Sequence, residues 1–83
     1  MKISFTRDGW EDYTSLTGER SILLRINRMI TEAARDPAQG IGRPEILSHN
    51  LSGYWSRRIT EEHRLVYQLR DGDLVIVQAR YHY

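Results

Sequence analysis

Residues 54–83, YWSRRITEEHRLVYQLRDGDLVIVQARYHY, decide the fold of this chain. The stretches 54–59, 64–69 and 74–83 are rich in β-branched and aromatic residues, which predicts three strands. Asp71-Gly72, between the last two stretches, is a dipeptide typical of a two-residue β-hairpin loop. We therefore expect an antiparallel meander whose last strand continues to the final residue.

The first part of the chain predicts a strand followed by two helices. Residues 2–5 alternate as a short strand does, and Thr6 can cap a helix with acidic first turns. A second helix should open at Glu19 and end before Pro37, because the residue before a proline avoids the α region. Its apolar residues recur at helical spacing: Ile22, Ile26, Met29, Ile30 and Ala33.

The order of these elements predicts the fold class. Residues 37–44 form a loop by their Gly and Pro content, and residues 45–47 can add a short strand. One strand, two helices and a meander together indicate an α+β fold. We expect a single domain over residues 1–83, with two N-terminal helices packed on one face of a mainly antiparallel, twisted sheet of four to five strands.

Composition limits the possible classes of protein. The chain has 83 residues, of which 40% are hydrophobic and 28% charged, as in an ordinary globular domain. It has no cysteine, which excludes disulfides, thiolate metal sites and a cysteine nucleophile. The sequence shows neither the apolar core of a signal peptide nor a run long enough to span a membrane. We expect a cytoplasmic protein.

The charge distribution directs attention to the second half of the chain. The net charge is only +1, but nearly all of the 12 basic residues are arginine, which suits bidentate contacts to phosphate. All three histidines also lie in the second half. Any nucleic-acid surface should therefore be a modest patch there.

Strand alternation predicts one partly polar face of the sheet. Side chains two residues apart share a face, so Tyr54 and Arg58 lie opposite Arg57. Alternation along the three strands places a set of polar residues on one face: Arg58, Arg64, Gln68, Gln78, Arg80 and His82. The apolar sets suit packing under the helices, and Tyr83 points away from His82 by strict alternation.

A histidine, several arginines and a nearby carboxylate suggest RNA cleavage in which the 2′-hydroxyl attacks its own adjacent phosphate. Such an enzyme needs a base, an acid and cations for the phosphorane charge, and it needs no metal or organic cofactor. Glu45 is the candidate base and His82 the candidate acid, because histidine changes charge near neutral pH. Arg58 and Arg64 would hold the phosphate, and the products would carry a 2′,3′-cyclic phosphate and a 5′-hydroxyl.

The segment GRPEILSHNLSGYWSRRITEEHRLVY (42–67), followed by ARYHY (79–83), resembles the YoeB branch of the RelE-type toxins of bacterial toxin–antitoxin pairs. WEDY (10–13) extends the resemblance over nearly the whole chain. The resemblance implies a microbial-RNase fold and an endoribonuclease that cuts mRNA in the A site of the 70S ribosome. It also implies partners: a YefM-like antitoxin, a second copy in a homodimer, and operator DNA reached only through the antitoxin complex, which represses its own operon.

The resemblance further implies the catalytic residues, which are Glu45, Arg58, Arg64, His82 and Tyr83. Tyr83 would position a base or the leaving group. Two positions depart from the usual family pattern, since Ser48 and Arg43 each stand where related sequences usually have Lys.

Additional contacts to RNA are expected from Arg43, Tyr54, Arg57 and Arg80, with Tyr54 able to stack on a base. For Arg57 a ribosome-facing role and a structural role both remain open. Two other functions also remain open. One is a non-enzymatic toxin on the same scaffold, similar to the ParE-type toxins that act on DNA gyrase; the other is a plain RNA-binding or operon-regulating module.

Overall fold

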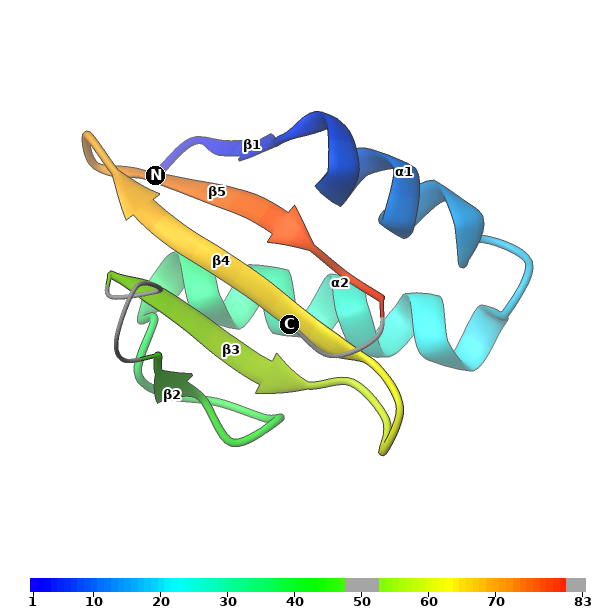
Figure 1. Cartoon of the computed structure of the whole chain (residues 1–83). Coiled ribbons are helices and arrows are strands. Elements are labelled where there is room, and N and C mark those ends of the chain that lie inside the picture. The colour runs from blue at the N-terminus through cyan, green and yellow to red at the C-terminus, as the bar shows by residue number, and fades with distance from the viewer. Residues whose placement is uncertain (48–52, 81–83) are drawn as a thin grey trace.

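The computed structural model describes residues 1–47 and 53–80. The helices in these ranges are α1 (Arg7–Ser15) and α2 (Arg20–Arg35), and the strands are β1 (Ile3–Phe5), β2 (Glu45–Ile46), β3 (Tyr54–Arg58), β4 (Arg64–Arg70) and β5 (Asp73–Gln78). The strands form one sheet in the order β1-β5-β4-β3-β2, in which β1 runs parallel to β5 and the other neighbours are antiparallel. Figure 1 shows α2 crossing one face of this sheet, with α1 following β1 beside β5. The predicted α+β fold, with two N-terminal helices packed against a mainly antiparallel sheet, is confirmed.

Both helices form where their local sequence favours them. Thr6 caps α1, because its Oγ1 accepts a hydrogen bond from the N–H of Gly9 at 3.1 Å. α2 ends before Pro37, as predicted. The apolar spacing of α2 brings four side chains into the core: Ile26, Met29, Ile30 and Ala33.

The last strand departs from strict alternation. Tyr67 pairs with Ile76, but the next pair joins Val66 to Gln78, so Val77 is an extra residue in β5. This β-bulge reverses the phase of the strand: Ile76 is buried in the core, whereas Gln78 shares the opposite face with Val66. Gln78 therefore lies on the predicted polar face with Arg64, but Ile76, which strict alternation would place there too, does not, because pairing with β4 decides the phase.

β5 also ends earlier than predicted, at Gln78 instead of the end of the chain. The next two residues are held by α1. Asp12 Oδ2 accepts a hydrogen bond from the N–H of Ala79 at 3.2 Å, and Arg80 Nη1 donates to Ser15 Oγ at 2.8 Å. The backbone N–H of Ala79 thus bonds to a helix side chain instead of continuing the sheet.

Arg57, on the helix side of β3, is completely buried. Its Nε donates to the hydroxyl of Tyr67 at 2.9 Å. Its two terminal nitrogens donate to four carbonyls of the loop after α2: Asp36 at 3.1 Å, Pro37 at 3.4 Å, Gln39 at 2.6 Å and Ile41 at 3.1 Å. The predicted contact of Arg57 with RNA or the ribosome is wrong, because every donor of the guanidinium points into the protein; of the two roles left open, the structural one is confirmed.

Glu32 fixes the same loop from the side of α2. Its Oε1 accepts the N–H of Ile41 at 2.7 Å, and its Oε2 lies 2.9 Å from Arg28 Nε. The hydrogen bond from Ile41, followed by the one from Arg28, holds the pKa of Glu32 below its usual value. The loop leads directly into β2, so these contacts also fix the position of Glu45, the first residue of that strand.

Gly42 lets this loop lie against β3. Its carbonyl accepts the N–H of Arg58 at 2.6 Å, and its φ of +89° lies in the left-handed region. A Cβ at this position would lie 2.7 Å from the Met29 sulfur and 3.0 Å from the Arg58 carbonyl oxygen. Only glycine fits both the dihedral angle and the space.

We expect Gly42→Ala to destabilise the protein more than Gly72→Ala. Gly72, in the β4–β5 hairpin loop, has a similar φ of +82°, but a Cβ there would meet nothing within 4 Å. Both changes carry a left-handed penalty of about 1 kcal/mol, and Gly42→Ala adds overpacking of about 1–3 kcal/mol. Urea unfolding of the two variants measures the difference, and equal losses would contradict the close packing at Gly42.

The free energy of unfolding should fall as the pH drops below about 4.5, the ordinary value for Glu32. The folded state lowers the pKa of this carboxyl, so its stabilising contribution is complete above that pH and is lost as the pH falls through the folded pKa. Glu32→Gln should therefore be less stable than the parent at pH 7 and should lose less stability on acidification. Urea midpoints measured from pH 7 down to about pH 3 check this, with the same change at exposed Glu61 as control.

Candidate active site

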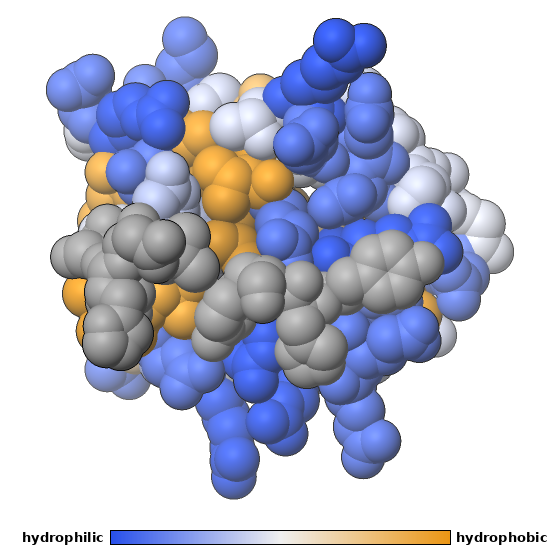
Figure 2. Space-filling model, viewed as in Figure 1, coloured by the Kyte–Doolittle hydropathy of each residue, from blue (hydrophilic) through white to orange (hydrophobic). Residues whose placement is uncertain are grey.

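The candidate site lies on the face of the sheet away from α2. Cross-strand pairing sets two neighbouring rows of residues on this face, Glu45–Ser56–Val66–Gln78 and Arg58–Arg64. Figure 2 shows this side of the molecule: hydrophilic residues cover most of it, and an apolar area lies toward the upper left. The register thus brings together three of the residues predicted to be catalytic, which are Glu45, Arg58 and Arg64.

Arg64 links the base candidate to the centre of the sheet. Its Nη1 lies 3.3 Å from Glu45 Oε1 and donates to Ser56 Oγ, also at 3.3 Å. The Arg64 side chain is only 15% exposed, whereas that of Glu45 is 57% exposed. The guanidinium is therefore held in place while the carboxylate stays open to a substrate.

Ser56 is the residue of the candidate site that sequence reasoning missed. Its side chain is fully buried, and its hydroxyl supports the guanidinium of Arg64. Alternation with Arg58 placed it on this face, but a single serine in a strand carries no chemical signal of its own. Only the register with β4 shows that it meets Arg64.

Arg58 is exposed, and its side chain makes no hydrogen bond or ion pair with any residue that the structure describes. It stands directly across from Arg64 in the β3–β4 pair. Like charges in directly opposed positions repel each other, and Glu45 offsets only one of the two. The pair therefore presents an excess of positive charge beside a carboxylate, which suits an RNA phosphate.

Two of the predicted RNA contacts border this cluster. Arg43 is exposed and follows Gly42, whose carbonyl binds the Arg58 backbone; its φ of +53° is uncommon for a residue other than glycine. Tyr54 is half-buried and lies two residues before Ser56, on the same face. Tyr54 stands across from Gln68 at the other end of β3 from Arg58, and the RNA contacts of Arg43 and Tyr54 stay predictions.

Other predicted residues lie elsewhere or are outside the described ranges. The guanidinium of Arg80 is directed to Ser15 at the end of α1, so its contact with RNA stays a prediction. Ser48, His82 and Tyr83 fall outside the described residues.

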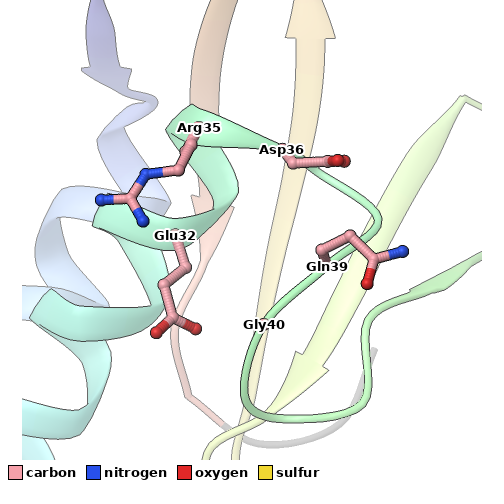
Figure 3. A pocket seen from close by; sticks show the side chains of 5 residues that line it. All are labelled: Glu32, Arg35, Asp36, Gln39 and Gly40. Atoms are coloured by element: carbon pink, nitrogen blue, oxygen red, sulfur yellow. The ribbon is translucent and has the colours of Figure 1, made fainter.

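A separate pocket of about 210 Å³ lies at the C-terminal end of α2. Figure 3 shows its lining: Glu32, Arg35, Asp36, Gln39 and Gly40. Two carboxylates against one guanidinium disfavour a phosphate, so this pocket does not extend the RNA site. Across residues 1–47 and 53–80, no three His, Asp or Glu side chains gather as they would around a metal ion.

Comparison with known proteins identifies the family. Residues 5–83 match the family described as YoeB-like toxin of bacterial type II toxin-antitoxin system. The chain belongs to this family. The predicted family is thus confirmed, and the chain is similar along its whole length to Toxin YoeB of Streptomyces coelicolor, with 58% identity and 100% of each chain covered.

Solved structures of YoeB toxins share the fold as well. The YoeB/ParE toxin from Agrobacterium tumefaciens is 42% identical, covers 100% of each chain and superposes with a TM-score of 0.94. The toxin in the YoeB–YefM complex from Staphylococcus aureus is 39% identical, covers 100% of this chain and 98% of its own, and superposes with a TM-score of 0.89. A YoeB dimer from the same organism matches equally well. In the described part of this YoeB-like toxin, neither helix has the length and apolar character needed to cross a membrane.

Removing Arg58 should not weaken the fold. Because Arg58 faces Arg64, we expect Arg58→Ala to leave the free energy of unfolding unchanged or to raise it by up to about 0.5 kcal/mol at low salt. Arg70 is a matched control: it faces Asp73 across the β4–β5 pair, so Arg70→Ala should lower the stability by a similar amount. Urea unfolding of both variants at low salt and at about 1 M salt tests these expectations. The stability changes of Arg58→Ala and Arg70→Ala should both become smaller at high salt, because salt screens the charges. A marked loss at position 58 would show that its side chain supports the fold.

Proposed function

We propose that this YoeB-like toxin is a ribosome-dependent endoribonuclease that cleaves mRNA in the ribosomal A site and so inhibits translation. The arrangement of Glu45, Arg64 and Arg58 carries this proposal. A solvent-open carboxylate stands 3.3 Å from one guanidinium, and a second guanidinium, which forms no ion pair within residues 1–47 and 53–80, lies in the next row. A base beside two cations is what an attack of the 2′-hydroxyl on its adjacent phosphate requires.

In the proposed reaction the RNA supplies its own nucleophile. Glu45 takes the proton of the 2′-hydroxyl as the 2′-oxygen forms a bond to the adjacent phosphorus. Arg58 and Arg64 stabilise the charge that builds on the phosphorane oxygens. The bond from phosphorus to the 5′-oxygen then breaks, which leaves a 2′,3′-cyclic phosphate on one product and a 5′-hydroxyl on the other.

The leaving 5′-oxygen needs a proton, and the proposal assigns that proton to His82. An imidazolium is a suitable acid near neutral pH because its pKa lies in that range. Tyr83 would position a base or the leaving group. The role of Tyr83 rests on the family resemblance, and that of His82 rests on the resemblance and on the chemistry of histidine. The proposed reaction requires no metal or organic cofactor.

The partners of the relatives supply the biological setting of the proposal. The S. aureus relatives form a complex with YefM and a dimer, and we propose that this chain binds a YefM-like antitoxin and pairs with a second copy. The complex with the antitoxin would bind operator DNA and repress its own operon. Without the antitoxin, the toxin would act on the ribosome.

Primer extension on a translated message, with and without ribosomes, tests this function. Cleavage should need ribosomes and should fall about 100-fold or more in Glu45→Gln, Arg58→Ala, Arg64→Ala and His82→Ala. Arg70→Ala, which removes an exposed arginine from the other end of β4, should cut at the normal rate. A non-enzymatic toxin or a binding module would cut nothing, or would be insensitive to these four changes.

The mechanism is tested separately with a modified message. A single 2′-deoxynucleotide on the 5′ side of the scissile phosphate removes the nucleophile and should abolish cleavage at that site alone. The 3′ ends of the normal products should resist ligation until the cyclic phosphate is opened and the resulting phosphate is removed. Undiminished cleavage of the deoxy-substituted message would mean that water or a protein group attacks the phosphate.

A further inference from the structure

Arg25 of α2 holds the backbone at the end of β3. Its Nε donates to the carbonyl of Ile59 at 2.7 Å, and its Nη2 donates to the carbonyl of Arg58 at 3.0 Å. One guanidinium therefore binds two consecutive carbonyls at the point where the chain leaves the strand. A rigid fork of donors suits this task better than a single ammonium would.

The backbone of Arg58 is held on its other side as well. Its N–H donates to the carbonyl of Gly42 at 2.6 Å, and the N–H of the next residue, Ile59, donates to His63 at 3.0 Å. Arg58 thus has its N–H fixed by the loop before β2 and its carbonyl fixed by Arg25. Within residues 1–47 and 53–80 no side chain supports that of Arg58, so in this part of the chain its placement depends on this backbone.

We propose that Arg25 is a positioning residue for Arg58. This inference rests on the proposed function, in which Arg58 stabilises the phosphorane. Loss of Arg25 would leave two carbonyls at the strand end without their donor and would let the stem of Arg58 shift. Misplacement of a catalytic group lowers the rate of the chemical step more than it weakens substrate binding.

The alternative is that Arg25 contacts ribosomal RNA directly with its charge. The position of the side chain argues against this. α2 packs on the face of the sheet opposite to Arg58 and Arg64, and the guanidinium of Arg25 is directed to the backbone carbonyls behind them. Arg25 therefore reaches the site through the backbone of β3.

Four variants separate the two roles. Arg25→Gln places an amide nitrogen where Nε stood, so it can keep the bond to Ile59 without the charge, whereas Arg25→Met keeps neither. Arg25→Lys keeps the charge without the fork. Arg20→Ala, at the exposed start of α2, removes a charge from the same helix as a control.

Single-turnover and steady-state cleavage on programmed ribosomes should give the following order. Arg25→Met should lower kcat about tenfold with KM changed less than about twofold, Arg25→Gln should fall between Met and the parent, and Arg20→Ala should match the parent. A direct charge contact predicts another pattern: Gln as poor as Met, Lys close to the parent, and the change mainly in KM. That pattern would overturn the proposal. Thermal melting shows which variants are folded. If Arg25→Met does not fold, the kcat and KM of Arg25→Gln are compared with those of the parent instead.

A double-mutant cycle with Arg58→Ala completes the test. If Arg25 acts through Arg58, Arg25→Gln and Arg25→Met should lower the rate of the Arg58→Ala enzyme less than about twofold. Equal losses in both backgrounds would show that Arg25 acts independently, which overturns the inference and leaves the proposed function intact. An Arg58→Ala enzyme that cuts normally would instead remove Arg58 from the mechanism, and both proposals would fall together.

Discussion

The buried guanidinium of Arg57 is the interaction on which the rest of the structure depends. The loop that joins α2 to β2 has no secondary structure of its own, so its carbonyls need donors from elsewhere. Arg57 supplies donors to four of them and also bonds to Tyr67 on the neighbouring strand. Burying a charge is costly unless it is fully hydrogen-bonded. Here the carbonyls of the loop accept the hydrogen bonds of the guanidinium, which in turn orders the loop. The loop then positions Glu45 at the edge of the sheet.

The adjacent residues Arg57 and Arg58 have opposite surroundings: Arg57 stabilises the fold, and Arg58 belongs to the candidate site. Arg57 points into the core and binds the loop, while Arg58 points to the open face and binds none of the described side chains. Glu45 and Ser56 both contact Arg64, so one cation of the facing pair is held, while no side chain in residues 1–47 and 53–80 holds the other. Placing two cations directly opposite each other does not itself stabilise the fold, since they repel each other. An anionic substrate between them would remove the repulsion.

The end of the sheet illustrates the same coupling between packing and site. Val77 is an extra residue in β5, and the two residues that follow Gln78, Ala79 and Arg80, bond with α1 instead of continuing the strand. The acidic motif at residues 10–13, one of the sequence features shared with the toxin family, supplies one of these bonds through Asp12. Residues far from the Glu45 cluster thus fix the backbone of Ala79 and the side chain of Arg80.

The sequence by itself determined the elements and the family. The spacing of apolar residues predicted α2, Asp71-Gly72 predicted a hairpin loop in which both residues have positive φ, and the motifs around Glu45 and Arg58 indicated the toxin family. These features depend on neighbours within a few residues, where local conformational preferences act. The burial of Arg57 and the bulge at Val77 were decided only by the tertiary structure. The burial of Arg57 depends on carbonyls 16 to 21 residues away in the sequence, and the bulge at Val77 depends on pairing with the facing strand. The fold brings these partners close, and a local sequence pattern does not predict them.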